Sequence, residues 1–178
     1  KKIKKISKKY KFFTINDNCH AMGSEYYNDK KYAIDYSDIV TQSFHPVKGI
    51  TTGEGGAVIT NNYKIYENIK IMRSHNIIKK PNKGDWVYDI KSAGFNYRMN
   101  EFQAALGISQ LKKINDFLKY RRKIAQHYDN KLKNYSFLNY TKKVNKRVKS
   151  SYHLYSVIFD FKKNKVSKKN FFQFMKKK

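Results

Sequence analysis

The chain has 178 residues, of which 40% are hydrophobic and 16% aromatic, so it can form a packed core and is not expected to be disordered. No apolar run approaches the ~20 residues needed to span a bilayer, and the single cysteine, Cys19, excludes an internal disulfide. The length allows one domain and part of another. We therefore expect a cytoplasmic protein without a membrane partner.

The formal net charge is +26, which by itself would favour a basic nucleic-acid-binding module. Only five of the 39 basic residues are arginine, however, and the lysines accompany many asparagines, isoleucines, tyrosines and phenylalanines. A- and T-rich codons encode this set of residues. Arginine is also the residue that reads guanine edges and stacks on bases. Coding bias and a solvated surface are therefore the favoured explanation, and no nucleic-acid partner is expected.

The first sixty residues alternate short apolar runs with polar clusters. Apolar residues at helical spacing predict a helix over 1–10, and because no capping residue precedes it, we expect the chain to begin inside a helix. Buried strands are predicted at 12–15, 39–44 and 57–60. Each strand ends in a polar cluster or at a proline.

Helices dominate the next part of the chain. One is predicted over 65–72, and a loop-rich excursion containing a proline and two glycines follows over 79–97. Asn100 can cap a helix, with Gln103 three residues on to complete a capping box. Apolar residues at helical spacing then predict one long helix that reaches Leu132.

The last part of the chain predicts an antiparallel strand over 152–161 and a helix that starts at Ser167. Strands interleaved with helices indicate an α/β fold. We expect residues 1–132 to belong to one domain and residues 133–178 to open a second, smaller α+β domain.

Two polar clusters follow predicted strands, at 17–23 and 43–56. Open α/β sheets bind ligands at the carboxyl ends of their strands. In the second cluster, Lys48 is followed by four glycines and two threonines, a loop that can bring backbone close to a ligand and aim one amine at it. In the first cluster, Cys19 and His20 lack two further ligands at metal spacing, so no metal site is expected.

Four segments together resemble the signatures of the DegT/StrS-type sugar aminotransferases, enzymes that use pyridoxal 5'-phosphate (PLP). They occur in the family's order between residues 3 and 172 and read NDNCHAMGSEY (16–26), SFHPVKGITTGEGG (43–56), GFNYRMNEFQAALGISQL (94–111) and SYHLYSVIF (151–159). The segment around the lysine is most similar to the branch that aminates 4-keto-6-deoxy UDP-N-acetylhexosamines on the way to pseudaminic-acid-type sugars. The resemblance implies the type I, aspartate aminotransferase-like fold, with the carboxy-terminal part of its large PLP-binding domain and a truncated start of its small domain.

The resemblance also assigns cofactor-binding residues. Lys48 corresponds to the lysine that forms the Schiff base and then acts as a base, and Asp17 to the acid that pairs with the pyridine nitrogen. His20 would pack near the ring or near Asp17, and Ser43 would bind the phosphate. Asn96 matches a residue that reaches the phosphate from the neighbouring subunit, which implies a homodimer.

The family's substrate contacts correspond to His45, Arg98 and His153, the last of which is expected within a strand. The implied function is transamination of a 4-keto-6-deoxy nucleotide sugar with a donor such as glutamate, for cell-surface sugar biosynthesis. Dehydrating members of the family carry histidine at the position of Lys48, so the lysine favours transamination. Family members are longer, and their phosphate-binding loop and ring-stacking residue have no counterpart here.

Other interpretations stay open for these residues. A catalytically silent fragment of such an enzyme is the alternative function. Lys48 has an ordinary surface lysine as its alternative, and Asp17 could simply cap a loop after a strand. The histidines of the two clusters, and His153, could be structural.

Overall fold

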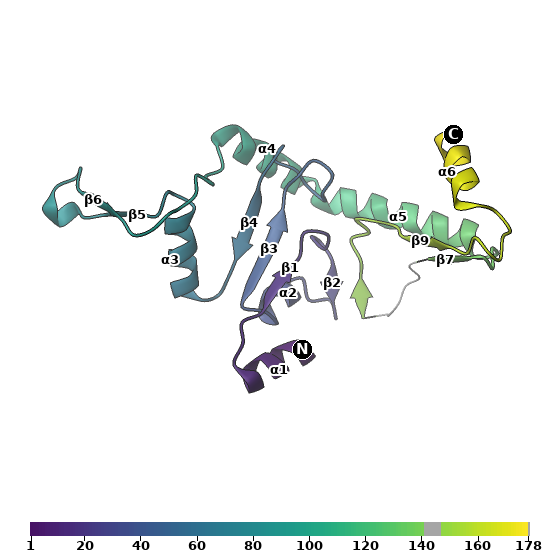
Figure 1. The fold of residues 1–178 in the computed structure, drawn as a ribbon, viewed down its shortest axis with the longest axis horizontal. Helices are drawn as coiled ribbons and strands as arrows, with labels where there is room; N and C mark the ends of the chain where they lie inside the picture. The colour runs from purple at the N-terminus through teal and green to yellow at the C-terminus, as the bar shows by residue number, and fades with distance from the viewer. Residues whose placement is uncertain (141–146, 178) are drawn as a thin grey trace.

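A three-stranded sheet lies at the centre of the computed structural model, which describes residues 1–140 and 147–177 (Figure 1). Strands β1 (Ile15–Asp17) and β3 (Ile39–Ser43) run parallel, and β3 pairs with β4 (Gly56–Ile59) in the antiparallel sense. Val40, on the central strand, is only 1% exposed. The three predicted strands are thus present, but the first starts at residue 15 rather than 12, because the apolar residues before it form an exposed connection. The prediction that the strands are buried is wrong for β1 and β4, since Ile15 is 68% exposed and Val58 47% exposed.

Three helices flank this sheet along the chain: α1 (Lys2–Tyr10), α2 (Tyr32–Asp35) and α3 (Tyr63–Met72). The first lacks a side-chain cap at its start, as the sequence predicts. Asn62 caps α3 by accepting a hydrogen bond from the backbone N–H of Ile65 at 3.1 Å.

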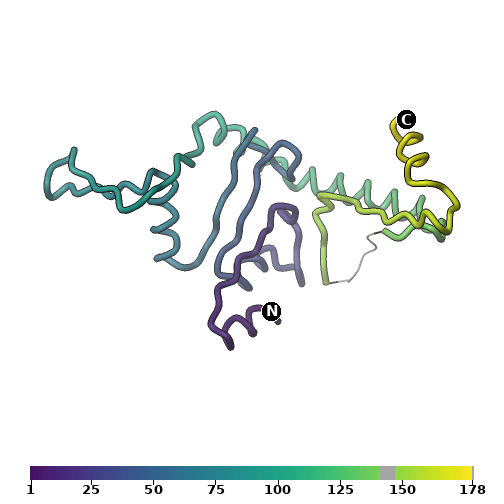
Figure 2. Tube along the Cα trace, in the orientation of Figure 1, coloured from purple at the N-terminus to yellow at the C-terminus, as the bar shows by residue number. Residues whose placement is uncertain are grey.

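The predicted loop over 79–97 contains regular structure. It forms a hairpin of β5 (Ile77–Lys79) and β6 (Tyr88–Ile90), which enclose the short helix η1 (Pro81–Lys83). The hairpin projects from the body of the molecule (Figure 2). Trp86, near its tip, is 81% exposed.

The single long helix predicted up to residue 132 is wrong, since two helices cover it: α4 (Glu101–Lys112) and α5 (Ile114–Leu132). Lys113, with φ −98° and ψ −1°, is a turn residue between them. The predicted capping box is confirmed, because Asn100 and Gln103 each accept a hydrogen bond from the other's backbone N–H, at 2.9 and 3.0 Å.

The carboxy-terminal elements lie along and beyond α5 (Figure 1). Strand β7 (Leu138–Tyr140) pairs antiparallel with β9 (Val157–Phe159), and α6 (Lys168–Lys176) follows, capped by Ser167 as predicted. The predicted strand over 152–161 is therefore much shorter than expected. Strand β2 (Glu25–Tyr26) pairs antiparallel with β8 (Val148–Lys149), although the two are far apart in the sequence.

Within the described residues, the buried apolar side chains are Ala33, Val40, Ile50, Leu118 and Ala125. Val40 lies on the central strand, and Leu118 and Ala125 lie on α5. The domain division predicted at residue 132 coincides with the end of α5 and remains a prediction. None of the helices in the described ranges is long and apolar enough to cross a membrane.

Candidate functional site

The carboxyl ends of β1 and β3 meet at one edge of the sheet. Asp17 is the last residue of β1 and lies opposite Thr41 in the parallel ladder, two residues before Ser43. Its Oδ1 accepts a hydrogen bond from the backbone N–H of Cys19 at 3.0 Å. Hydrogen bonds from Cys19, and then electrostatic interactions with His20 and Lys48, lower the pKa of Asp17. The carboxylate is thus held in its ionised form at this edge.

Lys48 lies in the tight loop that connects β3 to β4. The backbone N–H of Phe44 donates to the Gly55 carbonyl at 2.8 Å, and the N–H of Thr52 donates to the Phe44 carbonyl at 3.0 Å, which closes the loop. Lys48 is half-buried, and its Nζ forms no hydrogen bond or ion pair with the residues that the structure describes. Its charge is among the causes that lower the pKa of Asp17, so amine and carboxylate interact.

Glycines allow this loop to be tight. Gly55 has φ +149°, and a Cβ there would overlap the Thr52 hydroxyl; a Cβ on Gly56 would lie 2.6 Å from the Gln42 carbonyl oxygen. Helix α4 supports the loop, since the Gln103 side chain donates to the Glu54 carbonyl at 3.1 Å. The loop is therefore fixed from both sides around Lys48.

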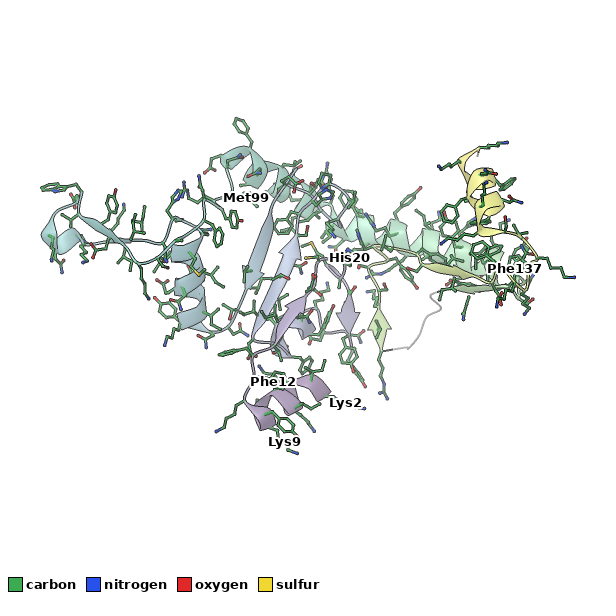
Figure 3. The ribbon with its side chains drawn as sticks, in the orientation of Figure 1. Lys2, Lys9, Phe12, His20, Met99 and Phe137 are labelled. Carbon is green, nitrogen blue, oxygen red and sulfur yellow. The ribbon has the colours of Figure 1, made fainter. Side chains whose placement is uncertain are left out.

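His20 and His153 come together although they are far apart in sequence. Their ring centroids lie 4.3 Å apart, with the ring planes tilted by 42°, and Figure 3 shows His20 near the start of α5. His153 precedes β9 and lies in irregular backbone, so its predicted place within a strand is wrong. Burial, followed by electrostatic interactions with His20, Lys48 and Arg121, lowers the pKa of His153, which favours its neutral ring.

The Nδ1 atom of His153 is buried and has no hydrogen-bond partner in the part of the chain that the structure describes. Buried polar atoms are normally paired, so this atom is available to a ligand or a water. A cavity of about 10 Å³, room for roughly one water, lies beside it. Its walls include Cys19, His20, Gly49, Arg121, Ser151 and His153.

The loop around Lys48 holds two more predicted residues. The Ser43 hydroxyl accepts from the His45 backbone N–H at 3.4 Å. The His45 ring turns back on its own loop, where Nδ1 accepts from the Val47 N–H at 3.3 Å and Nε2 lies 3.9 Å from Glu54 Oε1. His45 is exposed.

Asn96 and Arg98 lie apart from this group. Asn96 forms an isolated bridge with Ser74, and the backbone N–H of Tyr97 donates to the Arg73 carbonyl at 2.8 Å, which fastens this segment to the end of α3. Both predicted residues are exposed. Figure 3 shows Met99 well separated from His20, although its Cε would lie 3.1 Å from a Cβ on Gly55 in the Lys48 loop. The single chain thus gathers Asp17, His20, Ser43, Lys48 and His153 but not Asn96 or Arg98.

Sequence reasoning missed Arg121 and Arg122 on α5. Arg121 lines the cavity beside His153, and Arg122 bonds to the loop after β1 and to the segment before His153. The available signal was their position between Leu118 and Ala125, which form the buried stripe of the helix. Arginines next to such a stripe face the protein rather than the solvent.

Several known proteins resemble this chain in sequence and fold. A UDP-4-amino-4,6-dideoxy-N-acetyl-beta-L-altrosamine transaminase of Campylobacter jejuni is 42% identical over 156 residues, which cover 88% of this chain and 40% of the relative. The solved structure of Helicobacter pylori PseC, an aminotransferase involved in the biosynthesis of pseudoaminic acid, matches with a TM-score of 0.82 and 38% identity over 92% of this chain and 43% of that one.

A putative sugar aminotransferase of Streptococcus pneumoniae, solved in its PLP form, matches with a TM-score of 0.73 and 28% identity, over 83% of this chain and 37% of that one. The chain therefore spans less than half the length of these relatives. The likeness confirms the predicted fold class, a part of the type I α/β aminotransferase fold. The model of the DegT/DnrJ/EryC1/StrS aminotransferase family matches residues 1–178, and the chain belongs to that family.

Proposed function

We propose that this chain carries part of the active site of a PLP-dependent aminotransferase that passes the amino group of a donor such as glutamate to a 4-keto-6-deoxy nucleotide sugar. The observation that carries the proposal is that Asp17 and the loop of the half-buried Lys48 lie at the carboxyl ends of two neighbouring parallel strands, β1 and β3. The names of the Campylobacter and Helicobacter relatives support the sugar class. We further propose a cytoplasmic homodimer that serves cell-surface sugar biosynthesis.

The residues at this edge fit PLP. The cofactor needs an amine for attachment, a carboxylate for its pyridine nitrogen, and donors for its phosphate. Lys48 supplies the amine and Asp17 the carboxylate, and the Ser43 hydroxyl lies at the end of the adjacent strand. Asn96 is exposed and bridges to Ser74 rather than to these groups, so in the proposal it serves the phosphate of a second copy.

When bound, PLP supplies an electron sink that stabilises negative charge on a substrate carbon. Asp17 keeps a proton on the pyridine nitrogen, because an ionised carboxylate beside that nitrogen favours its charged form. The Nζ of Lys48 holds the cofactor, and once free it takes the proton from the Cα of the amino donor. In the second half of the reaction the same Nζ delivers a proton to the sugar carbon that receives the amino group.

The remaining predicted residues act on the substrates in this proposal. The lowered pKa of His153 favours its neutral ring and its buried Nδ1 lacks a partner, so its ring can bond to a polar substrate group. His20 packs against His153 and also interacts electrostatically with Asp17. His45 lies exposed in the Lys48 loop and would contact the substrate. Arg98, also exposed, would bind an anionic group of the donor or the nucleotide.

Covalent labelling tests the proposal directly. The purified chain is mixed with one equivalent of PLP, reduced with borohydride and digested for mass spectrometry. We expect a pyridoxyl mass on the peptide that contains Lys48, and its loss in Lys48→Arg, which keeps the charge but cannot form the bond. Lys64→Arg, on the exposed face of α3, is the matched control and should keep the label. Equal labelling of many lysines, unchanged in Lys48→Arg, would contradict the proposal.

A catalytically silent piece of such an enzyme is the second candidate. It is favoured by the coverage of the relatives, since the chain matches only 40% and 43% of the Campylobacter and Helicobacter proteins. An unreduced sample of the PLP-loaded chain, supplied with glutamate and a keto-sugar nucleotide, distinguishes the two, because the reduction that traps the label also blocks catalysis. Labelling of Lys48 without any 2-oxoglutarate formed would favour the silent piece.

A further inference from the structure

Two segments that are distant in sequence contact the same face of α5, around residues 118–125. They are the loop 20–24 after β1 and the segment 150–153 before β9. Gly23, with φ +77°, packs so closely on α5 that a Cβ there would overlap the side chain of Leu118. The loop that carries His20 is therefore seated directly on the helix.

Arg122, one turn beyond Leu118, joins the two segments. Its Nε donates to the Ser150 carbonyl at 2.9 Å, and its Nη2 donates to the Gly23 carbonyl at 3.0 Å. One guanidinium thus bridges two backbone oxygens that lie 127 positions apart. The bonds are charge-assisted, and a lysine cannot reproduce the rigid fork that makes both at once.

Two serines continue the same junction. Ser151, only 5% exposed, donates from its hydroxyl to the His20 carbonyl at 3.2 Å, and its backbone N–H donates to the Ser24 hydroxyl at 3.0 Å. The two hydroxyls are themselves 3.1 Å apart. Hydrogen bonds of this kind fix Ser151 against the backbone of His20, and His153 follows two residues later.

We call these contacts the clasp: the two bonds from Arg122 to backbone carbonyls, together with the bonds of Ser24 and Ser151. We propose that Arg122 is a positioning residue, and that the clasp fixes His153 against His20 and toward the Lys48 side of the site. Arg122 touches neither histidine ring, so it acts through the backbone of the two segments. The catalytic meaning of this clasp rests on the proposed function, whereas the contacts themselves do not. Misplacement of a substrate-binding group by about 1 Å can cost roughly 100-fold in rate, so a clasp of this kind controls activity from outside the site.

Two readouts in the full chain test the clasp without the cofactor. The first is the titration of His153 by NMR, and the second is the rate at which iodoacetamide alkylates Cys19, the single cysteine, which lines the cavity between the histidines. The charged groups that face His153 are His20, Lys48 and Arg121, and Arg122 is not among them. A changed titration in an Arg122 variant therefore reports displacement of the ring.

In Arg122→Met we expect the pKa of His153 to rise toward its ordinary value as the ring leaves its buried place, and Cys19 to react at least ~3-fold faster as the junction opens locally. Lys123→Met, which removes a charge from the exposed neighbouring position, should leave both readouts unchanged. Added guanidinium ion should restore the wild-type values in Arg122→Ala, which leaves room for the ion, a rescue that general destabilisation would not show.

Wild-type values of both readouts in Arg122→Met would overturn the proposal. If that variant does not fold, Ser151→Ala removes the hydroxyl that bonds to His20 and is expected to shift His153 in the same direction, and an unshifted His153 there is equally decisive. Failure of Lys48 labelling would refute the proposed function while leaving these two readouts to decide the clasp.

Discussion

The carboxylate of Asp17 accepts a hydrogen bond from the backbone N–H of Cys19 at 3.0 Å, which places an ionised acid against the chain's single thiol. Burial, followed by the hydrogen bond and the charge of Asp17, raises the pKa of the Cys19 thiol. The thiol is therefore a reporter of the charge at the edge of the sheet.

Asp17→Asn should lower the pKa of Cys19, because a neutral amide no longer opposes the thiolate. The rate of alkylation by iodoacetamide, measured from pH 7 to 10, should reach its midpoint at a lower pH than in the wild type. Asp29→Asn is the matched control, since Asp29 accepts from the Lys31 N–H within its own loop. An unmoved midpoint in Asp17→Asn would show that the carboxylate does not act on the thiol.

The same substitution bears on the proposed reaction. An amide cannot hold a proton on the pyridine nitrogen as a carboxylate does, so Asp17→Asn should slow transamination at least ~100-fold, about 2.7 kcal/mol of barrier. The circular dichroism spectrum should not change, because Asp17 is exposed. Near-normal turnover would show that Asp17 only caps the loop after β1.

Asp38 should make the chain's stability depend on pH in the acid range. Bonds from Lys4 at 2.5 Å, and from the hydroxyl and the N–H of Thr14 at 2.7 and 2.8 Å, lower the pKa of Asp38 from 3.8 to about 2. Because the folded pKa is lower than the unfolded one, the stabilisation is complete above about pH 4 and is lost as the pH falls toward 2.

Asp38→Asn should therefore lower the free energy of unfolding by about 1–2 kcal/mol at pH 7, after discounting for partial exposure of the pair, and by much less near pH 2. Urea unfolding at the two pH values checks this. Asp35→Asn, an exposed neighbour, should show no such pH-dependent difference. A loss for Asp38→Asn that is equal at both pH values would contradict the linkage.

Two glycines of the Lys48 loop should respond differently to alanine. Gly55→Ala combines a left-handed φ of +149° with an overlap onto Thr52 and should cost about 2 kcal/mol or more. Gly49→Ala meets only Met22 at 3.9 Å and should cost less than about 1 kcal/mol. Thermal unfolding of the two variants gives the comparison, and equal losses would mean that the loop is not tight at Gly55.

The proposed homodimer can be tested by mixing two defective chains. If Asn96 serves the phosphate of the partner copy, both Lys48→Arg and Asn96→Ala should bind PLP poorly alone. Mixed dimers should regain binding at one site, which combines Lys48 of one copy with Asn96 of the other. Fluorescence titration with PLP measures the recovery. Mixing that restores nothing, while each chain dimerises, would place Asn96 outside the shared site.

The sequence foretold local structure well where a side chain bonds to nearby backbone. The capping box of Asn100 and Gln103 and the cap at Ser167 both formed as predicted, because their partners lie three residues away. The break at Lys113 was not predicted, since neither proline nor glycine marks it and the apolar spacing continues across it. The hairpin at 77–90 was not predicted, because its two strands have only three residues each and the proline and glycine between them indicate a loop.

The candidate site divides in the same way. Asp17 ends β1 and Lys48 follows β3, its neighbour in the sheet, so their placement at one end of the sheet could be expected from the strand-end rule. The contact between His20 and His153 depends on how α5 and the final segment pack, and no local pattern encodes that geometry. The position of Arg122 beside the buried stripe predicts that it faces the protein, but the two backbone oxygens that it bonds to depend on the same packing.

The clasp around Ser151 also carries a consequence for the order of folding. The loop that presents Lys48 closes between Phe44 and Gly55, whereas the bond from Ser151 to the His20 carbonyl closes 131 positions. Loop-closure entropy makes the longer closure costlier by about 2 kcal/mol. We therefore expect the Lys48 loop to form before the contact between Ser151 and His20. A pulse of iodoacetamide during refolding should then still alkylate Cys19 after the far-ultraviolet ellipticity has recovered. Protection of Cys19 that appears together with the ellipticity would mean instead that the distant segment docks at once, and that the chain assembles both ends of the site in a single cooperative event.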